Sequence, residues 1–295
     1  MTTDQTGADP RLPDPELAAL LQDSAARSFW AAVTQGRVAA DPALERQLAR
    51  EILALQGDYP AQTVARCYGS LLQRAGSALR ARARDGLSPA NGPEAALVEI
   101  AQAQQPFRGY FAVDQIDLQH RRFDGTLSAP LRREVFVSGD AVTVLPYDPL
   151  RDRLLLVEQF RPGPLARGEQ RPWLIEAVAG RIDPGESPEQ AARREAAEEA
   201  GLSLTSLLPV AEYYPSPGVM SEYLWSYLAL TDLPDLQGGV FGLAAEGEDI
   251  RSHIVSFDQA MAWQRAGRLA NAPLILTLFW LAAERARLRA DFAQA

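Results

Sequence analysis

The amino-acid sequence predicts a mixed α/β fold whose sheet is largely non-parallel, preceded by a helical N-terminal domain. From residue 15 to about residue 84, apolar residues recur every three or four positions, which is the helical period. After a linker rich in Gly, Pro, Asn and Ser at residues 85–94, the apolar period changes to two. Short strands and isolated helices then follow one another, a pattern typical of sheets covered by helices.

Three helices are predicted in the N-terminal region, over residues 16–33, 41–57 and 61–84. Apolar side chains stand at helical spacing in the first helix, and Asp41 followed by Pro42 marks the start of the second. The polar, proline-bearing residues 1–13 predict a flexible tail. A helical domain of unknown role is therefore expected over residues 14–97.

The alternating pattern that predicts strands begins near residue 115. The dipeptide Asp124-Gly125 predicts the turn of a hairpin, because it favours a tight two-residue turn. The predicted strands cover residues 115–123, 131–139, 141–147, 154–160, 172–180 and 222–230, and the closing helices cover residues 257–267 and 273–292. We expect these elements to form a second domain over residues 98–295.

The composition excludes several classes of function. The formal net charge of −9 argues against nucleic-acid binding, since an acidic surface repels phosphate backbones. All 29 basic residues are arginine, which excludes Schiff-base chemistry and a phosphate-loop lysine. The single cysteine, Cys67, cannot form an internal disulfide. Neither a basic-then-apolar leader nor a run of about 18 apolar residues occurs, which predicts a cytoplasmic protein without a membrane partner.

The stretch "GRIDPGESPEQAARREAAEEAGL", residues 180–202, carries strong signals for a helix over about residues 188–200. Ser187 is a good N-cap, Pro188 suits the first helical position, and Gln190 stands where the partner in a capping box belongs. Gly201 is a natural stop, because glycine adopts the left-handed backbone that ends many helices.

This helix places three glutamates on one face. At about 100° per residue, Glu199 lies about 40° from Glu195, and Glu198 lies about 60° to its other side. Hard oxygen ligands in such a cluster suit Mg²⁺, with Mn²⁺ as an alternative. Arg194 stands one turn before Glu198 and can pair with it. The glutamate spacing alone leaves the alternative of a solvated, charged helix face open.

The whole stretch resembles the Nudix box without a mismatch. The positions of that motif are filled here by Gly180, Glu186, Arg194, Glu195, Ala196, Glu198, Glu199, Gly201 and Leu202. Agreement at so many fixed positions is specific. The resemblance implies a Nudix α/β/α sandwich with a mixed sheet and a divalent-metal hydrolase of nucleoside diphosphates linked to another group.

Segments outside the box resemble the ADP-ribose pyrophosphatase branch of the family over about residues 105–285. They include "YYPSPGVMSE", with a proline at Pro217, and "LLLVEQFRPG". The resemblance implies ADP-ribose as substrate and AMP and ribose 5-phosphate as products. It also implies a domain-swapped homodimer, in which residues 98–139 form swapped antiparallel strands and residues 140–295 form the catalytic core.

The resemblance also implies roles for individual residues. Metal ligands would come from Ala179, Glu195, Glu198, Glu199 and Glu248. Substrate contacts would come from Tyr110, Phe111, Arg133, Arg161, Glu186, Pro217, Gly218 and Glu222. Arg194 would act in catalysis by holding the glutamates.

Two glutamates compete for the role of general base. By resemblance Glu246 activates the attacking water, and Glu222, in the proline-rich loop, is its rival. The family often has Ala-Asp-Glu-Asn-Glu-Asp where this chain has "AAEGED", so Ala245 and Gly247 depart from the pattern while both glutamates remain. A base on a loop suits a site that closes over its substrate.

Two other functions remain open from the sequence. One is hydrolysis of another nucleoside diphosphate sugar, such as GDP-mannose. The other is a noncatalytic nucleotide sensor that acts through the N-terminal helices. Residues 49–83 resemble the helical extension of some proteobacterial family members linked to tellurite resistance, but they show no catalytic constellation.

Overall fold

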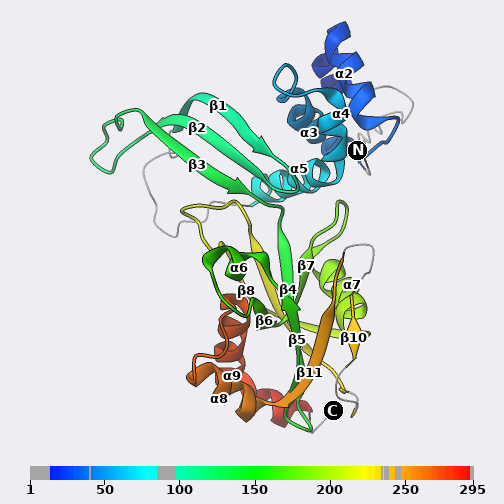
Figure 1. The fold of residues 1–295 in the computed structure, drawn as a ribbon, viewed down its shortest axis with the longest axis vertical. Coiled ribbons are helices and arrows are strands. Elements are labelled where there is room, and N and C mark those ends of the chain that lie inside the picture. Colours follow the sequence, from blue (N-terminus) through cyan, green and yellow to red (C-terminus); the bar gives the residue numbers. More distant parts are fainter. Residues whose placement is uncertain are drawn as a thin grey trace, which may run out of the picture. The chain divides into compact units, whose positions relative to one another are not determined.

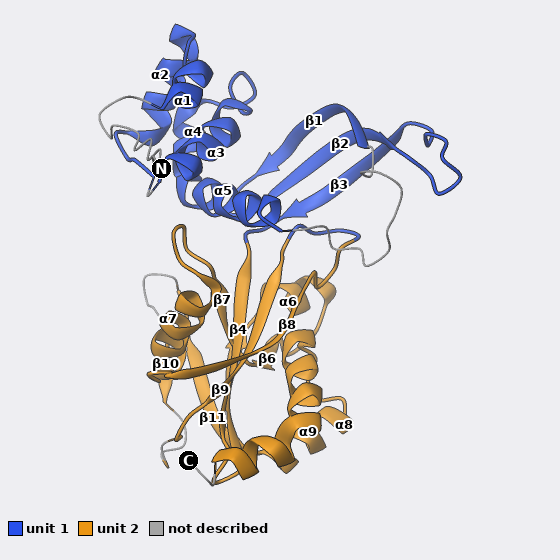
Figure 2. Cartoon of the chain, turned by 180° about the vertical axis from the view of Figure 1, so that it is seen from behind, with its two compact units in different colours: residues 1–139, 218–221 blue, residues 140–217, 222–295 orange. Residues whose placement is uncertain are grey.

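The structure is a computed structural model that describes residues 14–39, 41–84, 98–233, 235, 239–242 and 247–292. It divides into two compact units (Figure 2). The first comprises Met1–Gly139 with Gly218–Ser221, and the second comprises Asp140–Pro217 with Glu222–Ala295. None of the helices within the described ranges has the length and apolar character needed to cross a bilayer.

The first unit begins with helices α1 (Pro15–Leu20), α2 (Ser24–Thr34), α3 (Pro42–Leu53), α4 (Ala61–Arg66) and α5 (Tyr68–Arg82). Helices α2–α5 share a core that includes the fully buried Leu48, Ile52 and Leu71. The predicted helix over residues 16–33 is two helices, because Asp23 accepts a hydrogen bond from Ala26 N and so starts a new one. The helix predicted over residues 61–84 is likewise interrupted, at Cys67.

The first unit also contains an antiparallel sheet of three strands, β1 (Val98–Arg108), β2 (Ala112–His120) and β3 (Leu131–Val137), in the order β1-β2-β3 (Figure 1). The chain turns at Asp124-Gly125 as expected, with Gly125 at φ 84°, but the connection is longer than a two-residue turn: β2 ends at His120, β3 begins at Leu131, and Arg122 N donates to Thr126 O at 2.7 Å around the tip. Strand β1 lies within the residues 98–139 that the resemblance assigns to strands, but the apolar alternation did not mark it, because its pairing is irregular between Ile100 and Gln102 and between Gln104 and Phe107.

The second unit is built on one mixed sheet. Its main path runs β10-β11-β5-β4-β9-β8, with β6 added beside β5 and β7 added beside β4. The strands are β4 (Ala141–Asp148), β5 (Arg153–Phe160), β6 (Trp173–Glu176), β7 (Val178–Arg181), β8 (Ser206–Tyr213), β9 (Leu224–Leu230), β10 (Val240–Phe241) and β11 (Ile250–Ser256). Among the described pairings only β4 and β9 are parallel, which confirms the predicted, largely non-parallel sheet.

Helices cover both faces of this sheet (Figure 1). Alternate residues of β5 enter different core layers: Leu155 and Val157 pack in the layer with α7 (Pro188–Ala200), whereas Leu154 and Leu156 pack in the other layer. That second layer holds α8 (Phe257–Arg265) and α9 (Ala272–Phe292). A short helix, α6 (Pro162–Arg167), follows β5. The predicted α/β/α sandwich is therefore confirmed.

Two predicted strands differ from the structure. The single strand expected over residues 172–180 is two, because the chain changes partner at Ala177: β6 pairs with β5, and β7 pairs with β4. Strand β8 was not predicted, and its pairing with β9 is irregular between Pro209 and Ala211. Proline cannot donate to a strand ladder, which explains the weak strand signal there.

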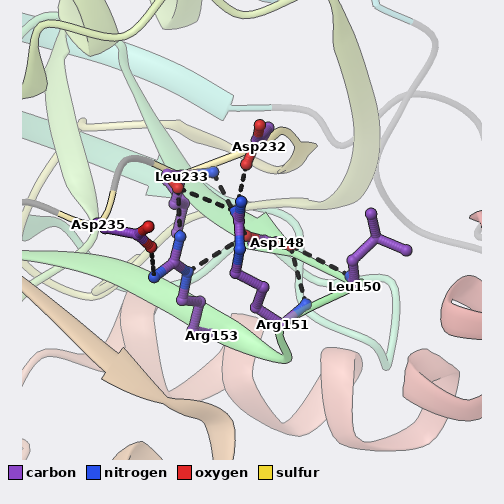
Figure 3. Close-up of polar contacts among 7 residues, drawn as sticks. All are labelled: Asp148, Leu150, Arg151, Arg153, Asp232, Leu233 and Asp235. Carbon is purple, nitrogen blue, oxygen red and sulfur yellow. Dashed lines mark hydrogen bonds and ion pairs between the residues drawn. The ribbon is translucent and has the colours of Figure 1, made fainter.

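A polar network ties the β4–β5 hairpin to the segment that follows β9 (Figure 3). Its centre is Asp148, which is 1% exposed and accepts hydrogen bonds from Arg151 Nη1 at 2.7 Å and Arg153 Nε at 3.2 Å. Arg153 Nη1 also pairs with Asp235 at 2.9 Å. The residues drawn are Asp148, Leu150, Arg151, Arg153, Asp232, Leu233 and Asp235. The anchored segment leads along the chain to β10 and to Glu248.

Candidate active site

Local chemistry places the glutamate helix α7 as the sequence predicts. Ser187 Oγ accepts from Gln190 N at 3.2 Å, and Gln190 Oε1 accepts from Ser187 N at 2.8 Å, which is a complete capping box. Gly201 ends the helix in the left-handed conformation at φ 64°. The caps fix where the helix begins and ends, and thereby which face its glutamates share.

Two of the three glutamates are buried, which excludes the alternative of a solvated helix face. Glu195 is 9% exposed and Glu199 is 2% exposed, whereas the side chain of Glu198 is 29% exposed. Glu199 Oε2 accepts a hydrogen bond from the backbone N–H of Ala179 on β7 at 3.0 Å. Helix α7 thus packs its carboxylates against β7, whose last two residues begin the Nudix stretch.

Arg194 joins the acidic residues of this stretch. Its guanidinium contacts Glu186 at 2.9 and 3.0 Å, Glu195 at 2.7 Å and Glu198 at 3.1 Å. It also donates to the carbonyl oxygen of Arg181 at 2.9 Å. The pair with Glu198 agrees with the prediction from helix spacing. The contact with Glu186 was not foreseen, because it depends on how the loop before the helix folds back.

Burial changes the acidity of the two inner glutamates. It raises the pKa of Glu195 to about 7; Arg194 opposes this shift, and the charges of Glu198 and Glu248 add to it. Burial also raises the pKa of Glu199 to about 8; the Ala179 N–H opposes this shift, and Glu195 and Glu248 add to it. Without a cation, the cluster therefore holds protons near neutral pH.

Arg161, which follows β5, is held by a buried carboxylate. Its Nε and Nη2 donate to Glu176 Oε2 at 2.8 and 2.7 Å, and Glu176 is 3% exposed. Asn271 Nδ2 donates to the other oxygen of Glu176 at 2.8 Å. The positive charge of Arg161 lowers the pKa of Glu199, so the two side chains interact electrostatically. Neither Glu176 nor Asn271 stood out in the sequence, because each occurs singly among apolar residues.

Glu248, which follows β10 in the chain, is a fourth acid of the cluster. The charge of Glu248 raises the pKa of both Glu195 and Glu199. A Cβ atom on Gly242 would stand 2.7 Å from Glu248 Cβ, so glycine is needed there for space. Glu246, the first candidate for the general base, lies outside the described residues.

The other residues to which the resemblance assigns substrate contacts are divided between the two units. In the first unit, the rings of Tyr110 and Phe111 meet edge to face at 4.8 Å, and Tyr110 is 71% exposed. Arg133 lies on β3, and Gly218 opens the segment that joins this unit. Pro217 and Glu222 belong to the second unit and flank that segment in the chain.

The donor set of the cluster fits a hard divalent cation. Glu195, Glu198, Glu199 and Glu248 offer carboxylate oxygens, and their mutual repulsion is what a cation would relieve. In the described parts of the chain, no three acidic, imidazole or thiol groups already surround one point. Arg194 instead engages Glu195 and Glu198, so these carboxylates would turn from the guanidinium to bind a cation.

The sheet lies between helical layers, and a capped helix packs buried glutamates against it. This arrangement defines a protein of the Nudix class. The NUDIX domain model matches residues 137–277. An ADP-ribose pyrophosphatase of Escherichia coli (strain K12) is 42% identical over 196 residues, which cover 66% of this chain and 93% of that protein. The chain belongs to the Nudix family, and its resemblance to the ADP-ribose pyrophosphatases of that family is confirmed.

Further relatives mark the range of activities among similar proteins. An ADP-ribose pyrophosphatase of Haemophilus influenzae is 36% identical over 194 residues, 65% of this chain and 89% of its own. A GDP-mannose pyrophosphatase of Escherichia coli O9:H4 is 31% identical over 172 residues, 58% of this chain and 88% of its own. A solved structure of an ADP compounds hydrolase matches with a TM-score of 0.51 and 21% identity, over 65% of this chain and 96% of that one, and shows the shared fold.

Proposed function

We propose that this protein is a hydrolase that splits the diphosphate bond of ADP-ribose into AMP and ribose 5-phosphate. The observation that carries the proposal is the cluster of buried glutamates that α7 packs against β7, with its complete Nudix motif. The 42% identity to an ADP-ribose pyrophosphatase over 93% of that relative supports the choice of substrate. A cytoplasmic location stays a prediction from the sequence.

The proposed reaction needs a divalent cation, for which Mg²⁺ is our first choice and Mn²⁺ the alternative. Glu195 and Glu199 would be its chief ligands, and Glu198, Glu248 and the carbonyl oxygen of Ala179 would complete the set. When bound, the cation would neutralise charge on the diphosphate and make water a better nucleophile. The raised pKa values of Glu195 and Glu199 support this assignment, because such carboxylates bind a cation in exchange for protons.

Other residues of the chain would bind the substrate, position the glutamates and accept a proton. Arg161, with its planar fork of donors, would bind the diphosphate, and the carboxylate of Glu176 would hold that fork in place. Arg194 would hold the side chains of the glutamates in position. Either Glu246 or Glu222 would take the proton from the attacking water, and Glu186, Pro217 and Gly218 would line the bound substrate.

We further propose that two copies of the chain share their active sites. Tyr110 and Phe111 of one copy would stack on the adenine base in the site of the other, and Arg133 would contact the substrate. The sheet β1–β3 supports this arrangement, because it presents apolar side chains to solvent: Val98 is 48% exposed, Ile100 61% and Phe107 58%. Such a sheet would be covered when strands of two copies exchange.

The second candidate is hydrolysis of a related nucleoside diphosphate sugar. It is favoured by the 31% identity to a GDP-mannose pyrophosphatase over 88% of that relative. Both candidates need the same cation site and the same bond cleavage, so they differ in the recognition of the base and the sugar.

Product analysis on ADP-ribose and GDP-mannose, with Mg²⁺ and with EDTA, tests the proposal. We expect AMP from ADP-ribose at a higher kcat/KM than products from GDP-mannose, and no product with EDTA. Glu199→Gln should lower kcat by about a thousandfold or more, whereas the control Glu189→Gln, an exposed residue of the same helix, should leave it within about twofold. Turnover in EDTA, or an active Glu199→Gln variant, would show that the glutamates are structural. Tight ADP-ribose binding without turnover would favour a sensor.

A further inference from the structure

The function proposed above assigns no role to the N-terminal helices. The NUDIX domain model begins at residue 137, so α1–α5 lie outside it. These helices have a core of their own, but they also bond to the sheet β1–β3 within the first unit. The residues that make these bonds show what the helices can do for the sheet.

Two of these bonds reach strand β1 and the residue that follows it. The Tyr59 hydroxyl donates to the carbonyl oxygen of Gln105 at 2.6 Å, and Cys67 Sγ donates to that of Gly109 at 3.4 Å. Both acceptors are backbone carbonyls, so the bonds fix the path of the chain as it leaves β1.

A third connection holds the beginning of strand β2. The guanidinium of Arg74 on α5 donates to both oxygens of Asp114, at 3.2 and 2.6 Å, and its Nε pairs with Glu51 of α3 at 2.7 Å. All three side chains are largely buried, with exposed fractions of 26% for Arg74, 18% for Asp114 and 14% for Glu51. A two-oxygen contact to a planar guanidinium fixes orientation as well as distance.

The helices therefore hold both sides of the turn between β1 and β2. Gly109 is the first residue of that turn, Asp114 follows it on β2, and the aromatic residues Tyr110 and Phe111 lie between them. Gly109 N donates to Phe111 O at 2.7 Å, which closes the turn, and the Phe111 ring lies 4.7 Å from that of Phe136 on β3. The turn is thus held by the helices on one side and by an aromatic contact within the sheet on the other.

We propose that the N-terminal helical domain positions the β1–β2 turn so that Tyr110 and Phe111 are already ordered when they meet the adenine base of the substrate. This inference rests on the proposed function, in which these rings contact the base. Binding is weakened when a loop must be ordered at the moment of contact, and a turn fixed in advance removes that cost. The helices would therefore set the affinity for the adenine end of the substrate and leave the chemical step unchanged.

A matched pair of substitutions on β2 tests the inference in the full chain. Asp114→Asn weakens the bond to Arg74 of the helices and a bond from Gln105 Nε2 of β1. Asp117→Asn weakens a more exposed two-oxygen bond within the sheet, to Arg132 of β3, at 2.7 and 2.7 Å. For Asp114→Asn we expect KM for ADP-ribose to rise about tenfold with kcat within about twofold, and Asp117→Asn to change KM less than about twofold. Tyr59→Phe, which removes a single hydroxyl, should shift KM in the same direction by a smaller factor.

Two measurements distinguish a role of the helices in positioning the β1–β2 turn from a general effect on protein stability. With an abasic analogue that joins two ribose groups through a diphosphate, Asp114→Asn should show the KM of the wild type. Amide hydrogen exchange over residues 107–113 should be faster in Asp114→Asn than in Asp117→Asn. The inference is overturned if ADP-ribose is cleaved and the two variants have equal KM, or if exchange at the turn does not change. Failure of the wild type to cleave ADP-ribose would instead overturn the proposed function, and the inference with it.

Discussion

The side chain of Glu195 occupies the space that any side chain on Gly180 would need. A Cβ atom built on Gly180 would lie 1.9 Å from both Cδ and Oε1 of Glu195. Since Gly180 does not have a positive φ, glycine is required here for space and not for backbone conformation. The first glycine of the Nudix stretch therefore makes room for one of its glutamates.

Gly180→Ala should displace Glu195 from the cluster. We expect kcat to fall by about a hundredfold or more, because small displacements of catalytic groups cost rates of that order. Circular dichroism should remain that of a folded protein. The control is Gly69→Ala on α5, where an added Cβ meets nothing within 4 Å and activity should not change. Wild-type activity in Gly180→Ala would contradict a metal-binding role for Glu195 in this position.

The pKa values of Glu195 and Glu199 predict how stability depends on pH in the absence of metal. Both lie above the value of an unfolded glutamate, at about 7 and about 8, so the folded state retains protons that the unfolded state loses. Their contribution to stability is present below about pH 4.5 and is lost as the pH rises through these values. In EDTA, the melting temperature should therefore fall between about pH 5 and pH 8.5.

The Glu199→Gln variant provides the control for that measurement, because glutamine does not titrate and the fall should be smaller. Added Mg²⁺ should raise the melting temperature of the wild type more at pH 8 than at pH 6, since ionised carboxylates bind it better. A wild-type melting temperature that rises across this range in EDTA, relative to Glu199→Gln, would show that the two glutamates are ionised in the free protein.

Arg194 should matter more than its neighbour Arg193. Arg194→Gln removes the guanidinium charge that Glu186, Glu195 and Glu198 share. We expect kcat to fall about a hundredfold and the free energy of unfolding to fall by about 1–3 kcal/mol. Because Arg194 opposes the upward shift of the Glu195 pKa, that pKa should rise further in the variant. Arg193, which donates to backbone carbonyls including that of Thr205 at 3.2 Å, is the control. Equal losses in Arg193→Gln and Arg194→Gln would point to helix stability alone.

Glu176 should act through Arg161. Glu176→Gln keeps the shape of the side chain but removes the charge that accepts two bonds from the guanidinium, so KM for ADP-ribose should rise about tenfold. In an Arg161→Ala background, Glu176→Gln should have no further effect on KM, because the guanidinium that it positions is absent. Glu158→Gln, whose side chain pairs with His253 at 2.9 Å, is the matched control on β5. Additive effects in the double variant would argue for independent roles.

The elements that the sequence predicted best are those with local chemistry at both ends. Ser187 and Gly201 flank α7 directly and Gln190 lies in its first turn, so the bounds of α7 follow from the sequence. The apolar pattern did not mark strand β1, because two irregularities in pairing mask its alternation. The break before α2 was missed because the cap at Asp23 lies within a helical apolar pattern. The contacts of Arg194 with Glu186 and of Arg161 with Glu176 span eight and fifteen positions, and no local pattern links such residues.

The sequence by itself determined the family, the limits of α7 and the shared face of its three glutamates, because caps and helical period act over only a few residues. The tertiary structure alone decided that Glu195 and Glu199 are buried against β7 and that their pKa values rise. It also decided that the N-terminal helices hold the β1–β2 turn. Burial and electrostatic coupling depend on which distant segments meet when the chain packs, and spacing along the chain does not specify those meetings.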